Sequence, residues 1–191
     1  ILPRLRLAAP PSGRLQHAAI GVGGQGNSDL ENIVASGKVD VYALCDIDER
    51  TLQKAAKRYP GARLYRDWRE MLDKEEKNID SVNVSTPDHM HAAPAMTAIR
   101  KGMHVFCETP RTPEIYEARK LTLAAREKGV ATQMGNQGMA FEGDRLITEW
   151  ISDGAIGTVR EVHVWSDRPT HGGKLFWAQG VDRPKDTPPV P

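Results

Sequence analysis

Short apolar runs alternate with amphipathic segments between residues 15 and 138. Each apolar run ends in glycine, proline or a polar residue, as buried strands of a parallel sheet do. The predicted strands are "HAAIGV" (17–22), "VDVYALCDID" (39–48), "ARLYRDW" (62–68), "IDSVNVSTP" (79–87), "MHVFCETP" (103–110) and "VATQMGNQG" (130–138). The predicted helices lie around 30–34 and over 49–59, 70–74, 93–102 and 114–129. This alternation predicts an α/β fold, a doubly wound parallel sheet with helices on both faces.

The pattern changes after residue 138. Residues 143–154 predict an amphipathic helix, and residues 158–169 alternate as a half-exposed strand does. The remaining residues are rich in glycine and proline and predict a long loop. We therefore expect three parts: residues 1–14 as a linker or a signal-peptide remnant, 15–138 as one α/β domain, and 139–191 as the start of a second domain that this sequence does not complete.

The predicted sheet also bears on the two cysteines, Cys45 and Cys107. With the strand order 3-2-1-4-5 they lie three strands apart, which is roughly 14 Å. A disulfide needs Cα atoms within about 7 Å of each other. The strand order therefore predicts that the two cysteines do not form a bridge.

Charge and composition exclude some classes of protein. Lys and Arg number 26 and Asp and Glu 25, so the chain lacks the basic excess of a nucleic-acid binder. No apolar run approaches the roughly 18–20 residues of a membrane span. Hydrophobic residues make up 39% and charged residues 27%, as in a soluble globular protein.

The first strand runs into a glycine loop, "GVGGQG", that opens the first helix. Its spacing, Gly21-x-Gly23-x-x-Gly26, is the dinucleotide-binding fingerprint in its proper strand–turn–helix context. Gly21 permits the tight turn, Gly23 lets the backbone approach a pyrophosphate, and Gly26 lets the helix pack against the strand. Gly24 and Gln25 lie within the same loop and belong to the predicted phosphate site. The alternative is a glycine-rich turn without a ligand.

Asp46 lies 20 residues beyond Gly26, at the end of the second strand. A carboxylate there accepts hydrogen bonds from the adenosine ribose and repels a 2′-phosphate, so NAD is favoured over NADP. Asp48 is a rival for this role, and Arg50 leaves NADP open. Asp46 could instead be only a helix N-cap.

Ligands of a parallel sheet bind beyond the carboxyl ends of its strands. The fourth strand ends there in Ser85, Thr86 and Pro87, which we expect beside the pyrophosphate and nicotinamide ribose. His89 and His91 follow at a helix start, where a cofactor contact or a cap is favoured over general-base catalysis. His-x-His lacks the further ligands of a zinc site, so no metal is expected.

Together these pieces resemble the Gfo/Idh/MocA (glucose–fructose oxidoreductase) family. The resemblance covers residues 15–191 and rests on "GVGGQG", "CDID", "STPDHMHA", "HVFCETP" and "ATQMGNQG" in the right order. It adds Glu108, Thr109, Asn136 and Gln137 to the implied cofactor site. The family usually reads Glu-Lys-Pro where this chain has Glu108-Thr109-Pro110, so Thr109 occupies the position of a lysine that assists proton movement.

The resemblance also implies a function and a setting. It implies an NAD(P)-dependent oxidoreductase acting on a hydroxyl of a sugar, polyol or related compound, with a second α/β domain built on an open antiparallel sheet. It implies a homo-oligomer of the full-length protein, and a subgroup exported through twin-arginine signals, so the periplasm is favoured over the cytoplasm. The acid–base residues would come from the second domain; His171 is the candidate within this chain.

Two other functions remain open at this stage. One is an NAD-dependent glycoside hydrolase of the same superfamily. Some of these hydrolases also lack the lysine at the position that Thr109 occupies here. A degenerate NAD-binding module, used for assembly or regulation, would retain the glycine loop and Asp46 without the catalytic chemistry.

Overall fold

The structure is a computed structural model that describes residues 13–165, 170–171 and 174–175. It divides the chain into two compact units, residues 1–140 and 141–191. Most of the predicted linker or signal remnant (1–14) and of the predicted C-terminal loop lies outside the described residues. No helix in the described part is long and apolar enough to cross a membrane.

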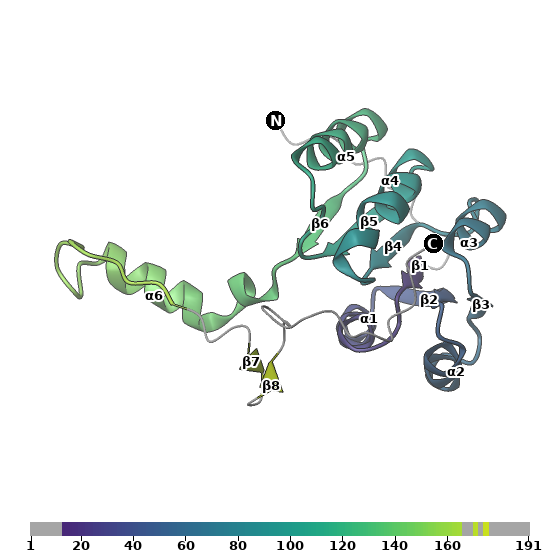
Figure 1. Cartoon of the computed structure of the whole chain (residues 1–191), viewed down its shortest axis with the longest axis horizontal. Coiled ribbons are helices and arrows are strands. Elements are labelled where there is room, and N and C mark those ends of the chain that lie inside the picture. The colour runs from purple at the N-terminus through teal and green to yellow at the C-terminus, as the bar shows by residue number, and fades with distance from the viewer. Residues whose placement is uncertain (1–12, 166–169, 172–173, 176–191) are drawn as a thin grey trace, which may run out of the picture. The chain divides into compact units, whose positions relative to one another are not determined.

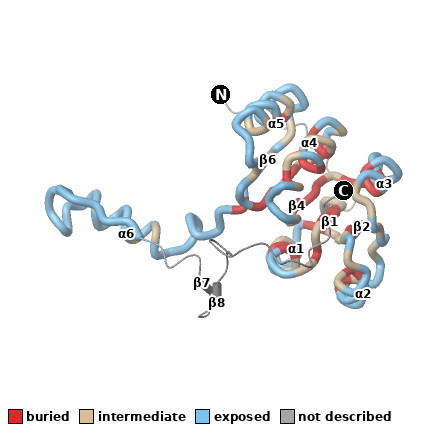
Figure 2. The backbone as a smooth tube through the Cα atoms, viewed as in Figure 1, coloured by how far each residue is buried: buried red, intermediate tan, exposed pale blue. Residues whose placement is uncertain are grey.

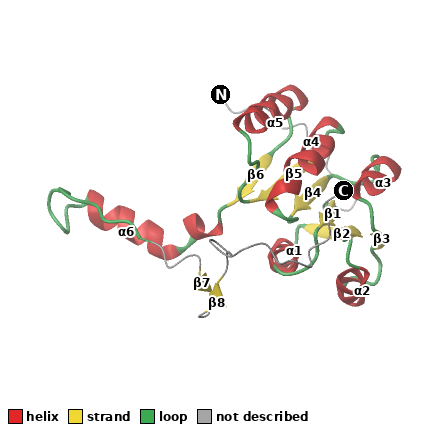
Figure 3. Ribbon diagram, in the orientation of Figure 1, coloured by secondary structure: helices red, strands yellow, loops and turns green. Residues whose placement is uncertain are grey.

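In the first unit, strands and helices alternate as the sequence predicts (Figures 1 and 3). The six strands are β1 (Leu15–Ile20), β2 (Val39–Cys45), β3 (Arg63–Tyr65), β4 (Ser81–Val84), β5 (His104–Glu108) and β6 (Thr132–Gly135). The helices are α1 (Gln25–Ala35), α2 (Glu49–Arg58), α3 (Trp68–Lys74), α4 (Ala92–Arg100) and α5 (Ile115–Lys128), with short 3₁₀ turns η1 (Asp88–Met90) and η2 (Gln137–Ala140). Local chemistry sets several boundaries: Asp48 and Asp67 cap α2 and α3, and Gly129 ends α5 at a φ of 66°.

The six strands form one parallel sheet in the order β3-β2-β1-β4-β5-β6. The predicted order 3-2-1-4-5 is confirmed, and β6 extends it. Between β1 and β4 the order in which strands are added to the sheet reverses, and the carboxyl ends of these two strands border the crevice where such sheets bind ligands.

The core is divided between the two faces of the sheet because neighbouring residues of a strand point to opposite sides. Ala18 and Ile20 of β1 pack with residues of α3, α4 and α5, whereas Ala19 between them packs with α1 and α2. Figure 2 shows this buried layer along the strands and the inner sides of the helices. Both faces of the sheet are therefore covered by helices, as predicted.

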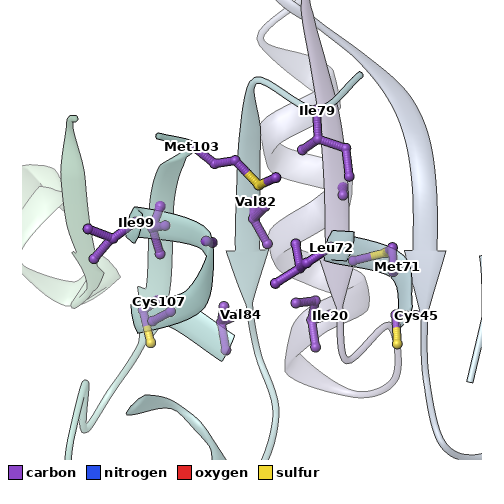
Figure 4. Close-up of a cluster of buried hydrophobic side chains, with 14 of the residues drawn as sticks. Ile20, Cys45, Met71, Leu72, Ile79, Val82, Val84, Ile99, Met103 and Cys107 are labelled. Atoms are coloured by element: carbon purple, nitrogen blue, oxygen red, sulfur yellow. The ribbon is translucent and has the colours of Figure 1, made fainter. Parts of the chain in front are cut away.

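The two cysteines lie at opposite sides of the larger cluster, with Val84 and Ile20 between them (Figure 4). Both thiols are free and buried. The prediction that Cys45 and Cys107 form no disulfide is confirmed. The reason is geometric, because β1 and β4 lie between the strands that carry the two cysteines, β2 and β5.

The second unit contains α6 (Glu142–Ser152), close to its predicted bounds, and a short antiparallel pair, β7 (Thr170–His171) and β8 (Lys174–Leu175). The predicted strand over 158–169 is wrong for its described part: residues 158–165 form no strand. Val162, Val164 and Trp165 are 72–90% exposed, so their apolar alternation has no partner among the described residues to pair with. The side chain of the candidate His171 lies outside what the structure describes.

Candidate functional site: a cavity at the carboxyl edge of the sheet

A cavity of about 650 Å³ opens at the carboxyl ends of the strands in the first unit. Six of the predicted cofactor residues line it together: Gly21, Gly23, Asp46, Ser85, Thr86 and Pro87. They come from three separate loops, after β1, β2 and β4. The fold therefore brings together residues that the sequence places more than sixty positions apart.

The glycine loop has no room for side chains at two of its positions. Gly21 adopts a φ of +81°, and a Cβ there would lie 2.5 Å from the carbonyl oxygen of Ser85. A Cβ on Gly26 would collide with the carbonyl oxygen of Gly21. These contacts hold α1 against the ends of β1 and β4, which is the packing role predicted for Gly26.

The first turn of α1 is open to an anion. The helix follows Gly24, which has no side chain to cap it, and its first turn holds no acidic residue. The first N–H groups of a helix lack partners within the helix and carry a partial positive charge. The N–H groups of Gly24 and Gln25 at this turn can therefore bind a phosphate group, whereas that of Gly26 donates to the carbonyl oxygen of Gly23 at 2.9 Å.

Asp46 is fixed at the rim of this loop. Its Oδ2 accepts from the N–H of Val22 at 2.9 Å, and its Oδ1 accepts from the N–H of Asp48 at 2.9 Å. The α2 cap is Asp48, which accepts from the N–H of Arg50 at 2.9 Å and pairs with its guanidinium. The rival Asp48 is thus engaged as a cap, and Asp46 lines the cavity as a carboxylate.

One polar atom of the cavity wall, the hydroxyl oxygen of Thr86, needs a partner that a dinucleotide can supply. The hydroxyl of Thr86 is buried and has no hydrogen-bond partner in the described structure. Buried hydroxyls without partners are uncommon in proteins, and this one belongs to a residue of the cavity wall. A polar ligand such as a pyrophosphate or ribose would supply the partner, so the residues present fit the group.

His91, predicted as a cofactor contact or a cap, is held by two backbone carbonyls and does not line the cavity. Its side chain is 1% exposed, and its two ring nitrogens lie 2.6 Å from the carbonyl oxygens of Thr86 and Pro110. It also makes no side-chain cap to α4. Because neither nitrogen is left for a ligand, His91 instead ties the loop after β4 to the loop after β5. His89, by contrast, lines the cavity.

Glu108, at the end of β5, is linked to Gln137 of η2 rather than to the cavity wall. Glu108 is 8% exposed; its Oε2 accepts from the N–H of Thr109 at 3.2 Å and its Oε1 accepts from Gln137. A Cβ on Gly135 would meet this carboxyl group, so a larger residue there would displace the end of the Glu108 side chain. Thr109 and Asn136 are exposed beside it. These residues form a second polar cluster at the same edge of the sheet.

Asp29 is the site residue that sequence analysis missed. It lies on α1, is 5% exposed, and accepts from Ser85 Oγ at 2.7 Å, Gln25 Nε2 at 2.8 Å and Gln137 Nε2 at 3.3 Å. It therefore joins the cavity residue Ser85 to the cluster around Glu108. A signal was present: Asp29 is three residues after Gly26, so it lies on the face of α1 that packs against the sheet.

The hydrogen-bonded chain continues inward from Ser85. Asn83 Nδ2 donates to Ser85 Oγ at 3.1 Å, and its Oδ1 lies 3.0 Å from His17 Nε2. Burial lowers the pKa of His17 to about 4, so its ring is neutral near pH 7. His17 Nδ1 meets Ser81 Oγ at 2.8 Å. This buried chain fixes the side chains that support the cavity.

Among the residues that the structure describes, no group of three or more His, Cys, Asp and Glu could hold a metal ion.

Comparison with known proteins identifies the family of this chain. The family model GFO_IDH_MocA, "Oxidoreductase family, NAD-binding Rossmann fold", matches residues 15–136. The chain is 34% identical over 82 residues to 1,5-anhydro-D-fructose reductase of Ensifer adhaerens, covering 43% of this chain and 25% of the relative. It is 28% identical over 106 residues to levoglucosan dehydrogenase of Pseudarthrobacter phenanthrenivorans, covering 56% of this chain and 27% of the relative.

A solved structure shares this fold. GenD2 from gentamicin A biosynthesis, crystallised in complex with NAD, superposes with a TM-score of 0.69 at 30% identity, covering 74% of this chain and 40% of that one. Each of these three matches spans less than half of the relative's own length.

Proposed function

We propose, from the premise that this chain belongs to the Gfo/Idh/MocA oxidoreductase family, that it is the cofactor-binding part of an NAD-dependent oxidoreductase acting on a hydroxyl of a sugar, polyol or related compound. The observation that carries the proposal is the cavity in which the glycine loop, Asp46 and the orphan hydroxyl of Thr86 meet. Bound NAD supplies a carbon that accepts a hydride from the substrate.

Different described residues bind different parts of the cofactor. The first turn of α1 takes the pyrophosphate, and Asp46 accepts from the adenosine ribose hydroxyls while repelling a 2′-phosphate. Thr86 Oγ1 donates to or accepts from the cofactor at the cavity wall. His91 holds the two neighbouring loops in place from behind.

The substrate class is inferred from the relatives, whose names denote an anhydrofructose reductase and a levoglucosan dehydrogenase. We assign residues 15–138 to cofactor binding and 139–191 to the start of a substrate domain with an open antiparallel sheet. The acid–base residues belong to that domain, with His171 the candidate here. A homo-oligomer and a periplasmic location are part of the same proposal.

Calorimetry and turnover assays test this function. The full-length protein should bind NAD(H) more tightly than NADP(H), and should reduce NAD with one of a panel of free sugars and cyclitols. Absence of binding to either nucleotide would overturn the proposal. Binding without turnover of any substrate, unchanged in Thr109→Lys, would indicate the degenerate module instead.

One observation favours a second candidate, an NAD-dependent glycoside hydrolase. Thr109 is exposed beside Glu108, where the related dehydrogenases carry a lysine, and a threonine hydroxyl is no base at neutral pH. An aryl glycoside distinguishes the two functions. Release of the aryl group without net NADH favours the hydrolase, whereas NADH formation from a free sugar favours the dehydrogenase.

A further inference from the structure

Two buried carboxyl groups, Asp29 of α1 and Glu108 of β5, meet at one amide. They are 5% and 8% exposed, and Gln137 Nε2 donates to Oδ1 of Asp29 at 3.3 Å and to Oε1 of Glu108. Two oxygens within hydrogen-bonding reach of one nitrogen lie at most roughly 6 Å apart. Within this distance, buried carboxylates repel each other strongly enough that they do not ionise independently.

No cation offsets this pair. Among the described residues, no lysine, arginine or histidine forms an ion pair with Asp29 or Glu108. The neighbouring position 109, where related enzymes carry a lysine, holds an uncharged threonine. Burial raises the pKa of Glu108, and the charge of Asp29 raises it further, against the opposing hydrogen bonds from the N–H of Thr109 and from Gln137.

The donors around the pair decide which group is protonated. Ser85 Oγ accepts from the Asn83 amide, so its single proton points to Asp29 Oδ2. Gln25 and Gln137 donate to Oδ1 of Asp29. Asp29 therefore accepts hydrogen bonds from three donors, one more than Glu108 does. Glu108 accepts from Gln137 and from the N–H of Thr109, and is left as the group that holds the proton.

We propose that Asp29 is a positioning residue that keeps Glu108 protonated, so that β5 presents a neutral carboxylic acid at the cofactor edge in place of a carboxylate–lysine pair. Because the proton is held between the two carboxyl groups, the pair acts on a bound cofactor through its net charge. The role of the pair toward a nicotinamide cofactor rests on the proposed function. The sharing of one proton between Asp29 and Glu108 does not.

The other titratable groups near the pair do not titrate in the same range. Cys107, before Glu108 on β5, has its thiol pKa raised to about 12 by burial, against the opposing charge of Arg111. His17 of β1, at the far end of the chain of hydrogen bonds, has its pKa lowered to about 4 by burial. The contacts from β4 and η2 come from uncharged serine, asparagine and glutamine side chains. A titration above the ordinary glutamate range therefore reports Glu108.

The direct test is a carbon-13 NMR titration of the protein labelled at the side-chain carboxyl carbons of glutamate. Glu108 is assigned as the resonance lost in Glu108→Gln. In the wild type it should titrate above the ordinary glutamates, and Asp29→Asn should lower that midpoint toward theirs. Glu127→Gln, a change at an exposed position of α5, should leave it unmoved. An ordinary midpoint in the wild type, or one that Asp29→Asn does not lower, would overturn the proposal.

A second measurement reads the role toward the cofactor. Oxidised NAD carries one more positive charge than NADH, so ionising the pair should favour the oxidised form. Calorimetry should show the preference for NAD over NADH rising several-fold as pH passes the Glu108 midpoint, and Glu108→Gln should remove this dependence. A preference that is flat in the wild type would overturn the cofactor role. If neither nucleotide binds, the proposed function fails, and the NMR titration still decides whether the pair shares a proton.

Discussion

Asp46 accepts a 2.9 Å hydrogen bond from the N–H of Val22, which ties the end of β2 to the turn of the glycine loop. The same carboxylate also accepts from the N–H of Asp48, so both of its oxygens are oriented by backbone groups. A side chain held from two sides presents its remaining lone pairs to the cavity in a fixed direction. Selection of the cofactor and rigidity of the phosphate loop therefore depend on one residue.

Replacing Asp46 tests this dual role. In Asp46→Asn the charge that accepts from the ribose and repels a 2′-phosphate is lost. NAD affinity should fall by roughly thirtyfold, the equivalent of about 2 kcal/mol for a charged hydrogen bond. The ratio of NAD affinity to NADP affinity should also decrease. Calorimetry with both nucleotides measures the change, and an unaltered preference would contradict the role.

The matched control is Asp48→Asn, two residues away. Asparagine is itself a good N-cap, so α2 should keep its stability within about 1 kcal/mol. NAD affinity should stay within about twofold of the wild type, because Asp48 serves the helix and its partner Arg50. A loss equal to that of Asp46→Asn would show that the two carboxylates act together.

The glycine loop makes a second prediction. In Gly26→Ala the new methyl group meets the carbonyl oxygen of Gly21, a backbone atom that cannot move without opening the loop. We expect destabilisation of about 2 kcal/mol and loss of measurable NAD binding. Gly61→Ala is the control, since nothing lies within 4 Å of its Cβ position. Urea unfolding and calorimetry on the same samples should separate the two variants.

The fold was largely predictable from the sequence because strands and helices have different hydrophobic periodicities, and because glycine, proline or polar residues mark where each element ends. The alternation of Ala18, Ala19 and Ile20 between the two cores illustrates why: a parallel strand covered on both faces must be apolar at every position. Gly21, Gly23 and Asp46 were found for a similar reason, because a tight turn and a strand end constrain both residue type and spacing.

Other features could not be predicted because they depend on contacts between distant segments. Asp29 looked like an ordinary polar residue of α1 until Ser85 and Gln137 were brought to it. His91 is at a helix start, as expected, but only the fold shows that it faces the carbonyls of Thr86 and Pro110. Residues 158–165 have the alternating apolar pattern of a strand, but a strand also needs a neighbouring strand to pair with, and the described residues provide none.

His91 gives a third prediction. In His91→Leu the carbonyl oxygens of Thr86 and Pro110 lose the ring nitrogens that face them, of which a neutral imidazole lets one donate. Loss of that donor should cost about 1 to 3 kcal/mol in the free energy of unfolding. The two loops that frame the cavity also separate, so NAD affinity should fall. His89→Leu, at an exposed position of the preceding 3₁₀ turn η1, should leave the free energy of unfolding nearly unchanged.

The two cysteines provide a fourth prediction. Burial raises the pKa of both the Cys45 and the Cys107 thiol to about 12, so thiolate is scarce at neutral pH. Neither should react with a thiol reagent such as 5,5′-dithiobis(2-nitrobenzoate) in the folded protein, and both should react in urea. Prompt modification of the native protein would contradict the buried positions that the strand order gives them.

The fifth prediction concerns acid stability and follows from His17. Burial lowers its pKa from 6.5 to about 4 on folding, so between these values the unfolded chain binds a proton that the folded chain does not. The contribution of neutral His17 is therefore complete above pH 6.5, declines as the pH falls, and is lost by about pH 4. The loss should be on the order of 3 kcal/mol. In His17→Gln, which cannot titrate, urea midpoints should depend less on pH across this window, whereas His89→Gln should keep the wild-type slope. An equal slope in His17→Gln and the wild type would assign the acid sensitivity to other groups.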